Sequence, residues 1–393
     1  MPLINHAGGG GGTPQLCGQV ENFKVIPGTT ARTAVLSWTA PSPDEDNSFV
    51  GARIVRKTGS APTGINDGTV VYEGTALSYT DTGLTAGTTY YYRAFAYNAR
   101  TKYQTAKRTV SLTVLAVGVD LVFGNNSWST IRYVSDCGGA QNFWSVGDRK
   151  QITIDGTING KTFSAEQGNA FILGFNHNAE IEGANRIHLC IAGEQYTPSD
   201  GQATYKAWYQ NYNSSGGAFY INESQNNAGG WGSSDMRTKI LGTSITSYTG
   251  TFLGALPADL RTELKSITKY TDNTGGACAE AASVTATTDY MFLLSPYEMA
   301  AVKASPSMPS IGLPIAVNPY EYEKQEQYAY FAAGNSKSFY VFSGSYTVAV
   351  LWSRSPSGNR VSTGGDRYNC FCDTTGKSHL CNYSQGIIPC VCI

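Results

Sequence analysis

Residues 84–98 read LTAGTTYYYRAFAYN, and this stretch determines the fold of the N-terminal part of the chain. A leucine and a glycine-containing turn lead into a run of aromatic and small residues, which is typical of a β-strand entered through a tight corner. Shorter runs of the same character precede it at 34–38, 52–57, 69–74 and 77–84. Turn residues separate these runs, so the spacing predicts a sandwich of short β-strands.

Four residues of this region occur in the order seen in fibronectin type III modules: Trp38, Leu84, Gly87 and Tyr90. In that signature a tyrosine near the start of a strand braces the preceding corner, and a buried tryptophan anchors the core. The resemblance implies a fibronectin type III-like β-sandwich over residues 18–117. Such modules usually act as spacers, so we assign no chemistry to this one.

The composition of the whole chain indicates a β-rich protein with many loops. Only 15% of its 393 residues are charged, the net charge is -1, and the chain contains 44 glycines and 25 tyrosines. This balance gives no indication of a nucleic-acid partner or of a charged membrane surface. Many aromatic and few charged residues suit an adhesive surface, but a plain β protein has a similar composition, and composition alone favours that plain reading.

The N-terminal segment 1–17 contains five consecutive glycines at 8–12. Glycine runs usually behave as flexible coil, so a flexible arm is the favoured interpretation and a close-packed arm in an assembly is the alternative. The segment lacks the basic and apolar regions of a secretory signal. The chain also has no apolar run of the length that spans a bilayer, so we expect synthesis in the cytoplasm without membrane insertion.

From about residue 118 the pattern changes to short strands, short helices and long loops, which predicts an α+β domain over 118–393. Ser127 is placed to cap a helix, and SPYEMAAV at 295–302 is a capping box. LPADLRTELKSI at 256–267 predicts a further helix, because its leucines and isoleucine share one helical face and a proline stands at its start. The predicted fold class is mainly β plus α+β.

Short motifs of residues 118–393 occur in the order seen in an uncharacterised domain family of phages and prophages of gut Firmicutes: NSWSTIRYVSDCGGAQNFWSVGD, ILGFNHN, GGWGSSDMR, LPADLR, KYTDNTG, TATTDYMFLLSPYE, YAYF, LWSRSP and GIIPCVCI. The chain resembles this family. The family is similar to the C-type-lectin fold of formylglycine-generating enzymes and of retroelement-diversified variable proteins. Its members occur on phage tails and other virion proteins, often behind Ig-like modules. The resemblance therefore implies a C-type-lectin-like domain in a virion protein.

The same resemblance implies where a ligand would bind. LWSRSP at 351–356 would end a strand that leads into displayed loops, and GIIPCVCI at 386–393 would be the final core strand. The segment 359–385 between them is rich in residue types that bind through hydrogen bonds and flat aromatic contacts. An ordinary polar loop is the alternative interpretation. The candidate ligand-binding residues are Asn359, Arg360, Arg367, Tyr368, Asn369, Asp373, His379, Asn382 and Tyr383.

Nine cysteines are too sparse over this length for a disulfide scaffold, but five of them cluster near the end of the chain, at 370, 372, 381, 390 and 392. Two C-x-C pairs place small apolar side chains on one face of a strand, so core packing is the favoured interpretation. Zinc binding together with His379 and a cross-strand disulfide are the alternatives. We expect no metal and no cofactor.

The sequence also assigns no catalytic residue. His177 and His188 are expected to be partly buried and hydrogen-bonded, and Arg237 or Arg354 is expected to form a buried ion pair. The sugar-binding triplets of calcium-dependent lectins are absent. The cysteine pair of the copper-dependent enzymes that share the lectin fold cannot be matched residue by residue to this chain.

These observations predict a non-enzymatic phage virion protein, on a tail or fibre, assembled in the cytoplasm of the bacterial host. Its partners would be a host cell-surface glycan or protein, bound by the C-terminal loops, and other virion proteins. The virion context also suggests a homo-oligomer. One alternative is a structural or decoration protein that contacts only other virion proteins. The other is an enzyme that acts on cell-surface material.

Overall fold

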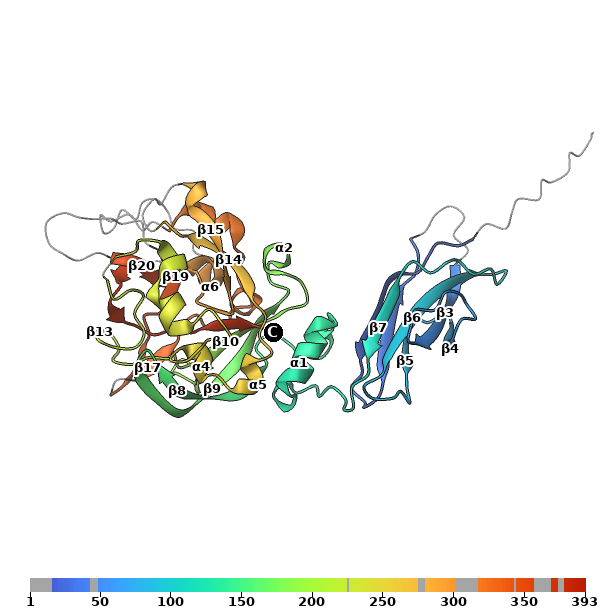
Figure 1. Ribbon diagram of the computed structural model, residues 1–393, viewed down its shortest axis with the longest axis horizontal. Coiled ribbons are helices and arrows are strands. Elements are labelled where there is room, and N and C mark those ends of the chain that lie inside the picture. The colour runs from blue at the N-terminus through green and yellow to red at the C-terminus, as the bar shows by residue number, and fades with distance from the viewer. Residues whose placement is uncertain are drawn as a thin grey trace, which may run out of the picture. The chain divides into compact units, whose positions relative to one another are not determined.

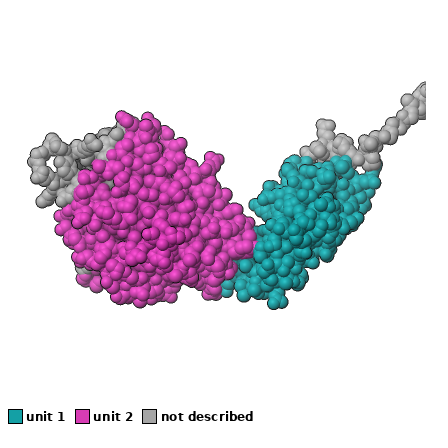
Figure 2. Space-filling model, viewed as in Figure 1, with its two compact units in different colours: residues 1–120 teal, residues 121–393 magenta. Residues whose placement is uncertain are grey.

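The chain divides into two compact units, residues 1–120 and 121–393 (Figure 2). The division lies close to the boundary predicted after residue 117. Each unit has its own set of buried apolar side chains. The computed structural model describes residues 16–42, 49–224, 226–274, 280–301, 317–342, 344–356, 369–373 and 378–393.

The first unit is an antiparallel β-sandwich. Its described residues form seven strands: β1 Glu21–Pro27, β2 Ala34–Thr39, β3 Phe49–Thr58, β4 Thr69–Gly74, β5 Ser78–Asp81, β6 Thr89–Asn98 and β7 Thr109–Thr113. One sheet has the order β1-β2-β5 and the other has the order β4-β3-β6-β7 (Figure 1). This arrangement is the fibronectin type III-like sandwich that residues 84–98 predict.

The corner before β6 is built as the sequence predicts. The hydroxyl of Tyr90 accepts a hydrogen bond of 3.2 Å from the backbone N–H of Thr85. Leu84 is buried, and Gly87 has a φ of +76°, a conformation that favours glycine because a side chain there is strained. Trp38 is buried too, with its ring 6.2 Å from that of Phe23. The four signature residues therefore fix the corner and the core of the sandwich.

The second unit is an α+β domain with short helices. In its described part the helical segments are η1 Phe123–Asn125, α1 Trp128–Asp136, η2 Ala140–Asn142, α2 Ala179–Glu182, α3 Gly230–Ser233, η3 Met236–Leu241, α4 Phe252–Ala255, α5 Ala258–Arg261, η4 Ala281–Ser283, α6 Pro296–Ala300, η5 Pro319–Lys324 and α7 Ala329–Ala332. The strands of the central sheet are β8 Arg149–Ile158, β9 Lys161–Phe175, β10 Ile187–Gly193, β16 Met291–Phe292 and β23 Cys390–Cys392. The other strands are β11 Gln195–Tyr196, β12 Thr204–Tyr205, β13 Ser214–Ser215, β14 Ile267–Asp272, β15 Val284–Asp289, β17 Tyr340–Phe342, β18 Tyr346–Val348, β19 Trp352–Pro356, β20 Asn369–Asp373, β21 Ser378–Leu380 and β22 Tyr383–Ser384.

The C-terminal strand β23 lies inside the central sheet, whose order is β16-β23-β10-β9-β8 (Figure 1). Leu189 of β10 and Met291 of β16 both pair with Val391. Every residue of β10 and β23 is buried, so this part of the sheet is covered on both faces. The expectation that GIIPCVCI is a core strand is confirmed.

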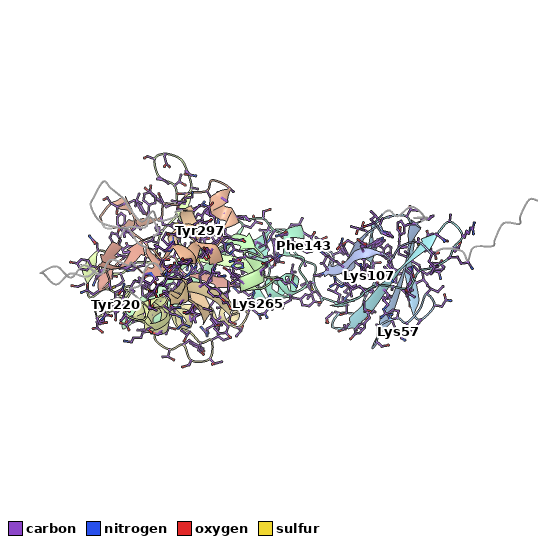
Figure 3. All side chains as sticks on the ribbon, turned by 90° about the horizontal axis from the view of Figure 1, so that it is seen from above. Lys57, Lys107, Phe143, Tyr220, Lys265 and Tyr297 are labelled. Atoms are coloured by element: carbon purple, nitrogen blue, oxygen red, sulfur yellow. The ribbon has the colours of Figure 1, made fainter. Side chains whose placement is uncertain are left out.

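The last residue of the chain is held by side-chain and backbone hydrogen bonds. The carbonyl of Ile393 accepts a bond of 2.8 Å from the backbone N–H of Ile187 and one of 2.9 Å from the hydroxyl of Ser135. The backbone N–H of Lys265, a residue labelled in Figure 3, donates at 2.8 Å to the carbonyl of Cys392. These contacts join the end of β23 to α1 and to the segment that precedes β14.

Two of the predicted helices form as expected, and one is wrong. Ser127 caps α1, and Ser295 and Glu298 form the capping box of α6. The helix predicted over 256–267 is only the single turn of α5. Arg261 points its guanidinium into the core, where it donates to the carbonyls of Leu253, Gly254 and Leu256. Lys265 then bonds to the C-terminal strand, and this tertiary pairing competes with the helix.

Candidate functional site

The structure describes part of the site predicted at 359–385. Four of the nine candidate residues lie outside the described residues: Asn359, Arg360, Arg367 and Tyr368. For three more it describes the strand but not the side chain: Asn369 and Asp373 in β20 and His379 in β21. The remaining two, Asn382 and Tyr383, are half-buried. The predicted nine-residue ligand site therefore stays a prediction.

Strands β19, β20 and β21 form an antiparallel sheet, with Phe371 paired to Pro356 on one side and to His379 on the other. All five residues of β19 are buried, so LWSRSP is a core strand that leads into this region. The cysteines nearby are of two kinds. Cys390 and Cys392 are buried free thiols, as core packing predicts, whereas Cys381 is disulfide-bonded. The disulfide that the sequence left open is thus present at Cys381.

The end of the predicted segment is tied to the loop at 209–215. Strand β22 pairs with β13, and the hydroxyl of Ser384 donates at 2.7 Å to the carbonyl of Gln210. The indole N–H of Trp352 donates at 3.3 Å to the carbonyl of Tyr383. These bonds hold the C-terminal segment beside a loop that forms one wall of a groove.

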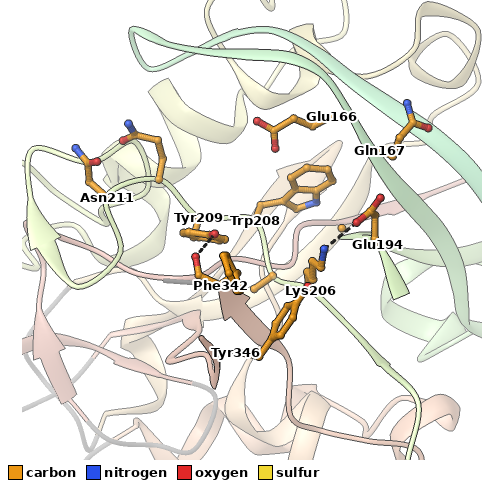
Figure 4. A pocket seen from close by; sticks show the side chains of 12 residues that line it. Glu166, Gln167, Glu194, Lys206, Trp208, Tyr209, Asn211, Phe342 and Tyr346 are labelled. Atoms are coloured by element: carbon orange, nitrogen blue, oxygen red, sulfur yellow. Dashed lines mark hydrogen bonds and ion pairs between the residues drawn. The ribbon is translucent and has the colours of Figure 1, made fainter. Parts of the chain in front are cut away.

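This groove is the candidate binding site of the described structure (Figure 4). It has a volume of about 630 Å³, within the range of small-ligand sites. Its walls come from β9, from the end of β10, from residues 206–211 and from the β17–β18 hairpin. The side chains that line it include those of Glu166, Gln167, Glu194, Lys206, Trp208, Tyr209, Gln210, Asn211, Phe342 and Tyr346.

The floor and the hairpin wall of the groove are rigidly placed. The indole N–H of Trp208 donates at 3.1 Å to the carbonyl of Ile191, which fixes the ring as a buried floor. The hydroxyl of Tyr209 donates to the carbonyl of Phe342. The backbone N–H of Ala207 donates at 2.8 Å to the carbonyl of Tyr340, so the hairpin is hydrogen-bonded directly to the segment 206–211.

Aromatic rings and one ion pair line the rim of the groove. Tyr346 stacks on Tyr196 with ring centroids 4.0 Å apart. The ammonium of Lys206 lies 2.7 Å from a carboxylate oxygen of Glu194 and 5.5 Å from the centre of the Tyr346 ring. The hydrogen bond to Glu194 raises the pKa of Lys206 above its ordinary value, so the ammonium stays charged.

Glu166 supplies a second carboxylate to the groove. Although the residue as a whole is exposed, burial of its carboxyl group against the groove wall raises its pKa. The amide side chains of Gln167, Gln210 and Asn211 also line the groove, and an amide group both donates and accepts hydrogen bonds. The groove thus combines flat apolar faces with hydrogen-bonding groups of both kinds.

The β17–β18 hairpin exposes apolar side chains to solvent. Phe342 is 48% exposed, Tyr346 is 38% exposed and Val348 is 55% exposed. Exposed apolar clusters next to a concave surface often mark binding sites. The sequence does not point to this site, because the resemblance of the C-terminal motifs directs attention to residues 359–385 instead. The signal available was YVFSGSYTV at 340–348, a hairpin pattern that alternates aromatic residues around a glycine turn.

A second hollow of about 630 Å³ lies between β8 and the turn of α5. Trp128 lines it, but its ring is buried and covered by the ammonium of Lys150 at 5.5 Å. Arg261 lines it as well, with its guanidinium bonded to backbone carbonyls.

The chain matches no known protein family, and no curated protein is similar to it. Its structural similarities are to fibronectin type III domains. One is the domain of human fibronectin type III domain containing protein 3, with 19% sequence identity over 27% of this chain and 93% of that domain and a TM-score of 0.23. Another is an Fn3-like protein from Clostridium thermocellum, with 22% identity over 25% of this chain and 91% of that protein and a TM-score of 0.20. The assignment of the first unit rests on its own strand order and its tyrosine corner.

Within the part of the chain that the structure describes, no helix combines the length and the hydropathy needed to cross a membrane.

Proposed function

We propose that this chain is a non-enzymatic phage virion protein whose second unit binds a host cell-surface glycan. The groove beside the β17–β18 hairpin is the observation that carries the proposal. The fibronectin type III-like unit serves as a spacer. The second unit is proposed to have a C-type-lectin-like fold, on the resemblance of its motifs to the gut-phage family.

The chemistry of the groove suits a saccharide. Sugar rings present C–H faces that pack on aromatic rings, here Tyr346 and Phe342, and hydroxyl groups that both donate and accept hydrogen bonds. Glu166, Gln167 and Asn211 offer complementary acceptors and donors. Because several polar groups stand around exposed rings, a hydroxyl-rich ligand gains more contacts than a purely apolar one.

The C-terminal segment supports the same placement. Ser384 bonds to the loop that carries Gln210, so a ligand in the groove would lie near the predicted display strands. Arg367, Tyr368, Asn369 and Tyr383 are proposed to extend the binding surface. Assembly with other virion proteins and into a homo-oligomer is part of the proposal, since repeated weak sites give high avidity.

The test is binding of the purified full-length chain to a panel of intact gut bacteria. The variant Phe342→Ser/Tyr346→Ser should reduce selective binding at least tenfold. The matched control is Val70→Ser/Leu77→Ser, which removes two similarly exposed apolar side chains from the first unit and should leave binding unchanged. Equal binding by both variants would contradict the groove as the site.

A second variant tests the display strands, with alanine at Arg367, Tyr368, Asn369 and Tyr383. If this variant loses binding and the groove variant does not, the binding site is the C-terminal segment and not the groove. Two outcomes would favour the alternatives. Absence of binding to every bacterium, together with defective particles carrying these substitutions, would favour a structural role. Turnover of purified cell-wall material would favour an enzyme.

A further inference from the structure

The charged side chains of the groove beside the β17–β18 hairpin do not balance one another. Of the described residues that line it, the charged ones are Glu166, Glu194 and Lys206. Lys206 and Glu194 form an ion pair of 2.7 Å, so their charges offset each other. No basic side chain among the described residues forms an ion pair with Glu166, and none contributes to its pKa. The described lining therefore has an excess negative charge at Glu166.

The register of β8 and β9 places Glu166 on the aromatic side of the sheet. Glu166 pairs with Ile154 of β8, and Gly168, two residues further along β9, pairs with Ile152. Side chains two residues apart in a strand point to the same face. The ring of Trp208 covers that face, since a Cβ added at Gly168 would lie 2.6 Å from it. The carboxylate of Glu166 is therefore on the side of the sheet that carries the indole floor (Figure 4).

This position withdraws the Glu166 carboxylate partly from water without supplying an opposite charge. Burial raises the pKa of Glu166, and no cation among the described residues lowers it again. A cation that enters the groove would supply the missing partner, and hydrogen bonds between opposite charges are stronger than neutral ones. The indole floor favours the same kind of ligand, because the face of a tryptophan ring attracts cations.

The same charges disfavour acidic and neutral ligands. An anion would meet the carboxylates of Glu166 and Glu194, and the ammonium of Lys206 is already bonded to Glu194. A neutral ligand can form hydrogen bonds in the groove, but it leaves the charge of Glu166 unmatched. A protonated amine both matches that charge and donates hydrogen bonds to the carboxylate.

We propose that the groove selects a saccharide with a free, protonated amine, an amino sugar, and that Glu166 binds the ammonium. This inference rests on the proposed function of the groove and narrows its ligand from glycans in general to cationic ones. Phe342 and Tyr346 contact the sugar ring, and Glu166 determines which charge the ring carries. N-acetylation removes the positive charge of the amine, so an N-acetylated sugar is the weaker ligand.

The first test is titration calorimetry of the full-length chain with one oligosaccharide in two forms. The probes are a β-1,4-linked glucosamine oligosaccharide and its fully N-acetylated counterpart, at a pH where the free amines are protonated. The parent chain should bind the free-amine form about tenfold more tightly, as expected for a hydrogen bond between charged groups. Glu166→Gln should bring the two affinities to about the same value. Equal binding of both forms by the parent chain, or a preference that survives in Glu166→Gln, would overturn the proposal.

The matched control for charge is Asp155→Asn. Asp155 is exposed and follows Ile154 on β8, so its side chain points to the opposite face of the sheet from that of Glu166. Its carboxylate accepts a bond of 3.2 Å from the backbone N–H of Ala165, and asparagine keeps an oxygen for that bond. The variant loses the same charge as Glu166→Gln and should keep the preference for the free amine. Loss of the preference in both variants would mean that the overall charge of the chain, and not Glu166, selects the ligand.

A second test uses intact bacteria, so its outcome does not depend on the linkage of the probe. Acetic anhydride acetylates the amines of the cell surface, and the binding that depends on Phe342 and Tyr346 should then fall about tenfold. Undiminished binding after acetylation would overturn the amine preference and leave the groove as a glycan site. If Phe342→Ser/Tyr346→Ser does not change binding to untreated bacteria, the proposed function of the groove fails, and this inference fails with it.

A third probe, tetralysine, separates an amino sugar from an amine on a peptide. It carries ammonium groups without a sugar ring, so it should bind at least about tenfold more weakly than the glucosamine oligosaccharide. Equally tight binding of tetralysine, lost in Glu166→Gln, would show that the groove recognises amines in general. The assignment to an amino sugar would then be wrong.

Discussion

The two units bury charge in different ways. In the first unit Asp81 is buried and accepts bonds of 2.8 Å at both oxygens from Arg56 and one of 3.0 Å from the hydroxyl of Tyr92. Arg56 keeps 22% of its side chain exposed. In the second unit Arg354 and Glu298 are both fully buried, and Lys269 contacts the same carboxylate.

This difference shows what each core depends on. The sandwich is held by alternating apolar side chains, and its ion pair at the sheet edge retains contact with water. The core of the second unit contains ions that have no water to replace a lost partner. Removing one partner of such a pair costs several kcal/mol, because the other charge stays buried. The second unit should therefore be far more sensitive to single charge changes.

The largest expected effect is that of Arg354→Met. Burial by itself disfavours the charged form of Glu298, and Arg354 and Lys269 overcome this effect and hold the pKa of Glu298 well below its usual value. Loss of the guanidinium should lower the free energy of unfolding of the second unit by about 3–5 kcal/mol. Arg56→Met in the first unit should cost less, about 2–3 kcal/mol, because Arg56 is partly exposed and the hydroxyl of Tyr92 still donates to Asp81. Denaturant unfolding of the full chain, followed by tryptophan fluorescence, measures both.

The double variant Arg354→Met/Glu298→Gln is the control for this comparison. It removes both charges of the pair, so it should recover part of the stability lost in Arg354→Met. If the double variant is no more stable than Arg354→Met, the loss comes from packing rather than from the charge of Glu298, which Lys269 alone would then balance. The difference in sensitivity between the two units would then arise from side-chain packing and not from buried charge.

The next effect is a pH dependence that arises in the second unit at Glu321. Burial raises the pKa of Glu321 to about 7 from 4.5, and the nearby negative charge of Asp272 acts in the same direction. Bonds from the Asp272 N–H and the Ser355 hydroxyl, and the charge of Arg354, only partly oppose this shift. Between these two pKa values the folded state binds more protons than the unfolded state. Stability should therefore fall as the pH rises through this range, by about 3 kcal/mol in total.

Glu321→Gln removes this titration while keeping the size of the side chain. The stability of the variant should vary less between about pH 5 and about pH 8 than that of the parent chain. Urea unfolding at several pH values gives the two curves. Parallel curves would show that Glu321 does not carry the dependence.

The sequence predicts the first unit better than the second for a physical reason. Strand alternation and the corner at Leu84, Gly87 and Tyr90 are local patterns, and each is visible within a short window. The core strand β23 is likewise expected from the sequence, through the resemblance of GIIPCVCI to a family motif. The buried ion pair expected at Arg237 or Arg354 is formed by Arg354 with Glu298, while Arg237 is half-buried and pairs with Asp289 at 2.6 Å.

What the sequence could not predict depends on residues that are distant along the chain. The buried ammonium of Lys269 contacts Glu182 and Glu298, which are 87 and 29 residues away along the chain. The groove likewise joins residues 166–167 to the hairpin at 340–348. The helix predicted over 256–267 is wrong for the same reason, since Lys265 bonds to the C-terminal strand.

A smaller effect is expected from Tyr92→Phe in the first unit. Burial and the adjacent Asp81 raise the pKa of Tyr92, so its hydroxyl stays protonated and donates to that carboxylate. Removing the hydroxyl should cost about 1–2 kcal/mol, because Asp81 keeps both bonds from Arg56. In thermal unfolding of the full chain, the midpoint temperature of the first unit should fall and that of the second unit should stay unchanged. A shift of the second transition would mean that the two units are energetically coupled.

The smallest effect on stability is expected at the hairpin of the groove. Phe342 and Tyr346 are partly exposed, and Tyr346 stacks on Tyr196, so replacing both with serine removes a limited amount of buried apolar surface. The free energy of unfolding should fall by about 1 kcal/mol. A large loss of stability would mean that these side chains support the core rather than a ligand. A small loss of stability together with a tenfold loss of binding would show that the two rings serve binding rather than folding. The second unit would then keep its core without them.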